Sequence, residues 1–125
     1  MRAKSIFRWS GIYGMVVLTP LYFMEDLVGR QTPPAITHPE YFYGFIGVAL
    51  AWQIVFLIIS GDPPRYRPLM IPAMLEKLTF GVASIVLLAM GRMALTTFCG
   101  AVMDLVWLCL FMWSYRQTPT PPISR

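Results

Sequence analysis

Charged residues are scarce in this sequence. Of its 125 residues, ten are lysine or arginine and six are aspartate or glutamate, which is 13% in all. Soluble domains carry about 25% charged residues. Few soluble chains of this length could bury a sequence that is 57% hydrophobic, because small domains keep a large fraction of their surface exposed. The scarcity of charge, together with a mean hydropathy of +0.60, therefore excludes an ordinary soluble domain and favours a protein whose solvent is lipid.

Residues that carry catalytic or redox chemistry are also few. The two cysteines, Cys99 and Cys109, lie in one predicted helix at a spacing of about 15 Å, which is too far for a disulfide. No CxxC pair occurs, so a thiol–disulfide oxidoreductase is not expected. The single histidine, His38, leaves no Ser-His-Asp set and no HExxH motif, and the sequence has no glycine-rich phosphate loop. We expect no metal ion and no cofactor, and a non-enzymatic role is favoured over an enzymatic one.

Long apolar runs predict four transmembrane helices, at residues 6–24, 41–60, 69–90 and 93–115. Each has roughly the 20 residues needed to cross a hydrocarbon core. Short loops join them, so residues 1–116 are predicted to form one all-α, four-helix transmembrane bundle with up-down-up-down topology.

The segments outside the spans are rich in proline. Pro20 should kink or end the last turn of the first helix. The prolines of residues 25–40 predict a stiff, non-helical loop. The proline-rich residues 117–125 are predicted to form a disordered cytoplasmic tail.

Basic residues set the expected orientation. Seven of them fall on one side of the predicted spans, namely Arg2, Lys4, Arg8, Arg65, Arg67, Arg116 and Arg125. Only Arg30 and Arg92 fall on the other side. The positive-inside rule then places both termini in the cytoplasm. Because these residues mark the ends of spans and form no stripe, nucleic acid is not an expected partner. Membrane lipid is the expected partner, with a membrane protein or a second copy of the chain as further candidates.

Small and amide residues inside the spans predict helix contacts. Gly11 and Gly14 allow a neighbour to approach the first helix. A second small-residue face is predicted in the next helix, at Gly44, Gly47 and Ala51. Gln53 is the one polar side chain inside that helix, and an amide in lipid usually forms hydrogen bonds across helices.

Glu76, Lys77 and Asp104 are the charged residues deepest in the spans. Charge inside a membrane is costly, so these residues are a functional-site hypothesis by default. Helical spacing groups Lys77 with Gly81 and Ser84. It groups Asp104 with Thr97, Gly100, Trp107 and Phe111. Both faces carry small or polar residues, which predicts that Lys77 and Asp104 face the bundle and form an ion pair. Glu76 is alternatively expected to join a charge cluster at the cytoplasmic end, formed with Arg8, Arg65 or Arg67. A structural role, a proton relay and a polar ligand pocket all remain open for these charges.

The blocks HPEYFYGF, DPPRYRPLM and EKLTFG resemble segments of small bacterial four-helix membrane proteins. More distantly, the layout resembles the DoxX-like group, whose members have four helices and a basic, proline-containing loop before the third. The resemblance implies a multi-pass protein of the bacterial inner (cytoplasmic) membrane and implies no particular activity.

Three functions are therefore weighed. The first is a non-enzymatic accessory or binding subunit. The second is a small proton-coupled transporter that uses Glu76, Lys77 and Asp104. The third is a membrane enzyme or binding protein for a lipid-like ligand. A closed, fully packed bundle favours the first, whereas a cavity beside Glu76 or Asp104 favours the other two.

Overall fold

The computed structural model describes residues 2–123, and within that range every regular element is a helix. In chain order these are α1 (Ala3–Leu18), η1 (Thr19–Phe23), α2 (Glu25–Gln31), α3 (Pro39–Gly61), η2 (Arg67–Leu69), α4 (Met70–Ala89) and α5 (Leu95–Gln117). The two η elements are short 3-10 helices. The four long helices begin and end within a few residues of the predicted ranges, except that the first ends as an α-helix at Leu18.

Among the described residues, three helical segments are long and apolar enough to cross a membrane. They are Pro39–Gly61, Arg67–Ala89 and Leu95–Gln117. Ala3–Phe23 and Glu25–Gln31 meet the same test only when taken together, and they are bent by 93° relative to each other. The chain therefore has three candidate spans, or four if this bent pair counts as one, and it has the character of a multi-span membrane protein.

The bend after the first helix begins where the sequence predicts it. Pro20 has no N–H to donate, so the α-helix ends at Leu18 and the chain continues as the 3-10 turn η1. The prediction of a non-helical segment over residues 25–40 is wrong in its first half, because α2 forms there. Acidic residues in the first turn of α2 and Arg30 in its last turn complement the helix dipole. The Tyr43 hydroxyl donates to Glu25 at 2.7 Å and so attaches α2 to α3.

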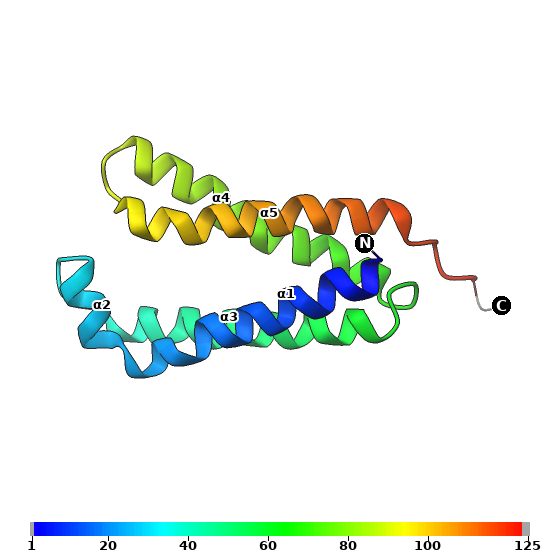
Figure 1. Cartoon of the computed structure of the whole chain (residues 1–125), viewed down its shortest axis with the longest axis horizontal. Helices are drawn as coiled ribbons and strands as arrows, with labels where there is room; N and C mark the ends of the chain where they lie inside the picture. Colours follow the sequence, from blue (N-terminus) through cyan, green and yellow to red (C-terminus); the bar gives the residue numbers. More distant parts are fainter. Residues whose placement is uncertain (1, 124–125) are drawn as a thin grey trace.

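The long helices pack as two pairs. α1 lies along α3 to form the first hairpin, and α4 lies along α5 to form the second hairpin (Figure 1). The two hairpins approach each other at the end that holds both chain termini and diverge toward α2 and the turn between α4 and α5 (Figure 1). That turn contains Gly91 in the left-handed region at φ 68°. The N–H of Gly91 donates to Leu88 and that of Arg92 to Leu87, which satisfies the last carbonyls of α4.

The close contact between α1 and α3 is made by the predicted glycines of α1. A Cβ at Gly11 would lie 2.9 Å from Leu57 Cδ2, and one at Gly14 would overlap the Gln53 amide. The first hairpin therefore closes because two positions on α1 have no side chain, which leaves room for longer side chains of α3.

The predicted small-residue contact on α3 is wrong. A Cβ at Gly44 would meet nothing within 4 Å, and Ala51 is exposed. Gly47 is approached only by the Tyr22 hydroxyl, at 3.3 Å from a Cβ placed there. The cause is that α3 contacts α1 through side chains on another face, since α1 already supplies the small residues.

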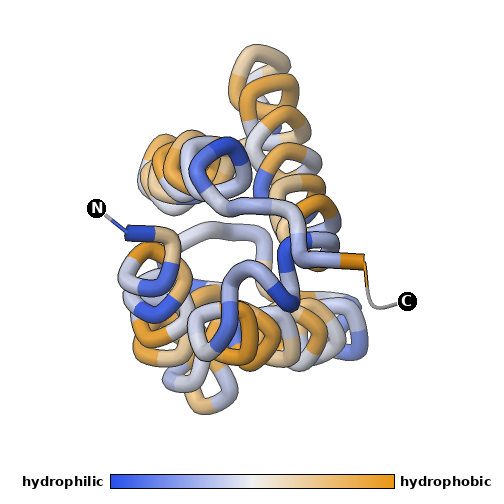
Figure 2. Tube along the Cα trace, turned by 90° about the vertical axis from the view of Figure 1, so that its right-hand side faces the viewer, coloured by the Kyte–Doolittle hydropathy of each residue, from blue (hydrophilic) through white to orange (hydrophobic). Residues whose placement is uncertain are grey.

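An aromatic cluster joins the two hairpins at the end near the termini. Phe7, Phe56 and Phe111 are fully buried and come from α1, α3 and α5. Phe7 stacks on Phe111 with ring centroids 4.3 Å apart, and Phe56 meets Phe111 edge-on at 5.0 Å. Four smaller buried residues complete this core, namely Ile6, Ile59, Met70 and Ala73. Viewed from this end, hydrophobic residues run along the helices, and hydrophilic residues gather at the helix ends nearest the viewer (Figure 2).

The predicted tail begins later than expected. Gln117 still belongs to α5, and Thr118 is buried. The Arg67 guanidinium stacks on the Tyr115 ring at 3.8 Å, while its Nε donates to the Thr118 carbonyl at 2.9 Å. The first residue after the helix is therefore held in place. Residues 119–123 are not helical, and Ser124 and Arg125 lie outside the described residues.

Candidate functional site

A cavity of about 680 Å³ lies between the two hairpins, and all four long helices line it. Tyr13 and Gly14 of α1 lie on one side, and Gly100 of α5 lies on the other. Because Phe7, Phe56 and Phe111 fill the end near the termini, the open volume falls between the diverging parts of the hairpins. The bundle is therefore not fully packed.

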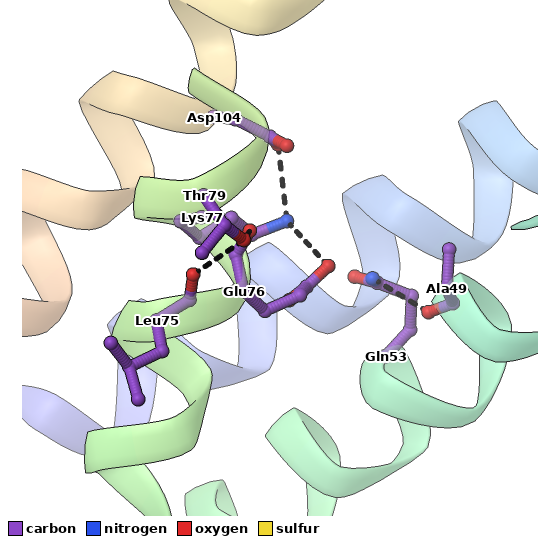
Figure 3. Close-up of polar contacts among 7 residues, drawn as sticks. All are labelled: Ala49, Gln53, Leu75, Glu76, Lys77, Thr79 and Asp104. Atoms are coloured by element: carbon purple, nitrogen blue, oxygen red, sulfur yellow. Dashed lines mark hydrogen bonds and ion pairs between the residues drawn. The ribbon is translucent and has the colours of Figure 1, made fainter. Parts of the chain in front are cut away.

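The three charged residues predicted from the sequence meet in this cavity. Lys77 Nζ lies 3.1 Å from Asp104 Oδ1 and 3.6 Å from Glu76 Oε1 (Figure 3). The Lys77 side chain is 6% exposed, against 23% for Glu76 and 20% for Asp104. The ammonium also lies 5.4 Å from the centre of the Phe56 ring. Lys77 thus sits between the aromatic core and the cavity, and one ammonium serves two carboxylates.

Close packing of α4 on α5 places Asp104 within reach of Lys77. Lys77, Gly81 and Ser84 are all buried on one face of α4, as their helical spacing predicts. A side chain at Gly81 would overlap Leu105, the residue next to Asp104. The second hairpin closes at this point because Gly81 leaves room for Leu105.

Gln53 lies in the cavity wall but does not bond across helices. Its Nε2 donates to the Ala49 carbonyl of its own helix at 2.9 Å, so the predicted interhelical hydrogen bond is wrong. The reason is the glycine opposite, because Gly14 has no side chain to pair with the amide. Gln53 is 2% exposed, and its Oε1 has no hydrogen-bond partner among the described residues. In Figure 3 the amide end is directed toward the Glu76 carboxylate, which lines the same cavity.

The predicted arginine cluster around Glu76 does not form. Within residues 2–123, Glu76 makes its ion pair with Lys77 and with no arginine. Arg67 binds the end of α5, Arg65 lies 5.4 Å from the Tyr66 ring, and Arg8 is exposed. Distance explains the difference, since nine helical residues separate Glu76 from Arg67 by about 13 Å.

Aromatic residues form the walls of the cavity, and the site residues predicted from the sequence did not include them. Phe45 and Trp52 of α3 and Phe80 of α4 line it. Phe45 stacks on Phe80 with centroids 6.1 Å apart, which links the hairpins across the cavity. A spacing signal was present, because Phe45 and Trp52 are seven residues apart and so share one face of α3.

The cavity combines apolar walls with a small charged floor, which is formed by Glu76, Lys77 and Asp104. Such cavities hold ligands through apolar contact, and a few convergent polar groups fix the orientation. Comparisons with protein families, with characterised proteins and with solved structures give no match for this chain.

Proposed function

We propose that this protein is a multi-pass protein of the bacterial inner membrane that binds a lipid-like amphiphile between its two hairpins. In this proposal the four long helices form an up-down-up-down bundle with both termini in the cytoplasm. The one observation that supports ligand binding most is the cavity of about 680 Å³ with Glu76, Lys77 and Asp104 at its floor. Known small-molecule sites enclose about 300–1,000 Å³. A purely accessory subunit would not need to keep this volume open.

The cavity is suited to a ligand that arrives through the bilayer. Two of its lining residues, Phe45 and Val48, are 50% and 64% exposed, so the cavity has an accessible apolar rim. An amphiphile in the membrane would meet this apolar rim before it meets the charged floor. Its apolar part would remain against the walls while its polar end reaches the charges.

Filling the cavity tests this function. A Cβ at Gly100 meets nothing within 4 Å, so Gly100→Phe should place its ring in the cavity without moving the backbone. Ala83→Phe is the matched control, because Ala83 is exposed on α4 and does not line the cavity. Each protein is purified in mild detergent, and its bound lipids are extracted and identified by mass spectrometry. We expect the wild type and Ala83→Phe to retain a bound amphiphile that Gly100→Phe loses. Equal lipid content in all three would refute ligand binding.

A second candidate function is a small proton-coupled transporter. The observation that favours it is that two carboxylates share one ammonium, an arrangement in which one carboxylate can gain and lose a proton. Reconstituted vesicles with an internal pH dye would then show a proton flux that Asp104→Asn abolishes. Absence of any proton flux in the wild type would refute transport and leave ligand binding as the one proposed function.

A further inference from the structure

The negative charges that line the cavity outnumber the positive charges. Glu76 and Asp104 each contribute one negative charge when ionised, and Lys77 contributes the single positive charge. Tyr13 is the other titratable residue in the lining, and it is neutral at ordinary pH. With both carboxylates ionised, the floor therefore carries a net charge of −1 in apolar surroundings, where uncompensated charge is costly.

Two buried hydrogen-bond acceptors of the cavity lining have no partner. Oε2 of Glu76 and Oε1 of Gln53 are both inaccessible, and neither has a partner among the described residues. The Gln53 amide nitrogen is already used on the Ala49 carbonyl, and Lys77 is directed to the two carboxylates. A buried acceptor without a donor is destabilising, because it has lost its hydrogen bonds to water. With both carboxylates ionised, the part of the cavity between Glu76 and Gln53 thus lacks a positive charge, and these two acceptors lack a donor.

The aromatic walls favour a cation as well. Trp52, Phe45 and Phe80 line the cavity above the charged floor. Aromatic ring faces attract organic cations, and they also give an apolar chain a surface to pack on. A carboxylate or phosphate group without an accompanying ammonium would instead add negative charge to a site that already has an excess.

We propose that the bound amphiphile carries a protonated amine, which enters between the Glu76 and Gln53 side chains, moves them apart and donates N–H hydrogen bonds to both. This inference rests on the proposed binding function and names its ligand class. The ammonium supplies the missing positive charge and, at the same time, donors for these two acceptors. An apolar chain or ring attached to it occupies the aromatic part of the cavity. The same chemistry is found in a long-chain amine and in an ethanolamine lipid head group.

A set of probes with one alkyl chain tests the head-group chemistry. Dodecylamine, dodecanol, dodecanoate and dodecyltrimethylammonium are titrated into the full-length protein in nanodiscs, and binding is followed by tryptophan fluorescence. Trp52→Phe identifies the part of the signal that comes from the cavity. We expect dodecylamine to bind roughly 10- to 100-fold more tightly than dodecanol, as hydrogen bonds to charged groups imply. Dodecanoate should bind most weakly, and dodecyltrimethylammonium, which has no N–H, should bind less tightly than the amine.

Variants connect the preference to the proposed residues. Glu76→Gln should remove the preference for amine over alcohol, and Glu76→Asp should keep it. Gln53→Met removes the second acceptor without changing charge and should reduce the preference. If an unfolded Glu76→Gln prevents its use, Gln53→Met still tests the site. Dodecanol or dodecanoate binding as tightly as dodecylamine to the wild type would overturn the inference.

Two further comparisons are needed. One distinguishes an ethanolamine lipid from a single-chain amine, and the other separates failure of the ligand class from failure of the proposed binding function. Displacement of dodecylamine by phosphatidylethanolamine but not by phosphatidylcholine would support an ethanolamine lipid, and displacement by neither would support a single-chain amine. If no probe binds and Gly100→Phe leaves the lipid content unchanged, the proposed function fails. Binding without any preference for amine refutes only the ligand class.

Discussion

Lys77 is the residue on which the charges of the cavity depend. Its ammonium contacts carboxylates from two helices, Glu76 beside it on α4 and Asp104 on α5. Removing it leaves two like charges in apolar surroundings, whereas removing Asp104 leaves Lys77 paired with Glu76. Replacing Lys77 should therefore lower stability more than replacing Asp104, although the two residues form one ion pair.

Single and double replacements should show this inequality. Lys77→Met is expected to lower the free energy of unfolding by about 3–5 kcal/mol, the typical loss when one partner of a buried pair is removed. Asp104→Leu should lower it by less, and the double variant should recover part of the Lys77→Met loss. Denaturation in mixed detergent micelles measures all three. Strictly additive losses would mean that Lys77 and Asp104 do not interact.

The charged residues of the cavity can be predicted from the sequence, but their contact partners can be predicted only in part. The free-energy cost of a charge in lipid identifies Glu76, Lys77 and Asp104 from the sequence, and all three line the cavity. Side chains lean toward the N-terminus of their own helix, so antiparallel helices would draw Lys77 and Asp104 apart. The length of the lysine side chain and the closeness at Gly81 outweigh that lean. The environment of Gln53 depends on a glycine from another helix, and no local pattern encodes it.

At the scale of elements, the first hairpin depends on the contact between α1 and α3. Gly14 lies against the Gln53 amide, and a methyl group there would overlap it. At Gly100, by contrast, a methyl group would meet nothing within 4 Å. Two helical glycines of one chain thus differ in whether a side chain can be added.

Alanine substitutions should separate these two positions. Gly14→Ala is expected to destabilise by about 1–3 kcal/mol through overpacking. Gly100→Ala should be neutral or stabilise by up to about 1 kcal/mol, because alanine favours the helix. Thermal unfolding in detergent gives both values. Adding Gln53→Ala to Gly14→Ala should restore part of the loss, and a failure to do so would show that the amide is not the obstacle.

The end of α5 is held by a residue outside it. Arg67 donates to the carbonyls of Tyr115 and Thr118, so truncation after Gln117 should lower the free energy of unfolding by about 1–2 kcal/mol. Truncation after Thr120 keeps both carbonyls and should have no effect. Melting temperatures of the two truncated proteins make the comparison. Equal melting temperatures would show that the contact to Thr118 contributes nothing.

Element boundaries follow from the sequence where apolar runs are long. Hydropathy and proline placement suffice for α3, α4 and α5 and for the end of α1. α2 is different, because it has seven residues and a proline-rich segment follows it. Its attachment through Tyr43 and Glu25 is a contact between residues 18 positions apart, which local propensity does not reveal.

At the scale of the whole molecule, two hairpins meet at an aromatic cluster and diverge elsewhere. Both chain termini lie toward the end that holds the cluster (Figure 1). The basic residues of the predicted cytoplasmic side include those of the segment just before α4. Orientation and shape together would direct the diverging end of the bundle toward the outer face of the membrane.

Reporter fusions test that orientation. Fluorescent-protein fusions at either terminus should be bright, because the cytoplasm permits folding of the reporter. An alkaline phosphatase inserted after Pro33 should be active, because that segment is expected outside. The same phosphatase inserted after Pro63 serves as the control and should be inactive. Phosphatase activity at either terminus would contradict the topology.

The shared ammonium has a consequence for how the protein is made. When α4 leaves the ribosome, Asp104 is still inside the exit tunnel, because it lies 27 residues after Lys77. During that interval Glu76 is the available counter-ion, and α4 carries both charges into an apolar environment alone. The short turn at Gly91 then delivers α5 directly beside it. We expect α4 to insert poorly by itself and efficiently when α5 follows. Glycosylation mapping of two chains, one that ends after α4 and one that continues through α5, would measure the difference. The second hairpin, rather than the single helix, is then the unit that enters the membrane.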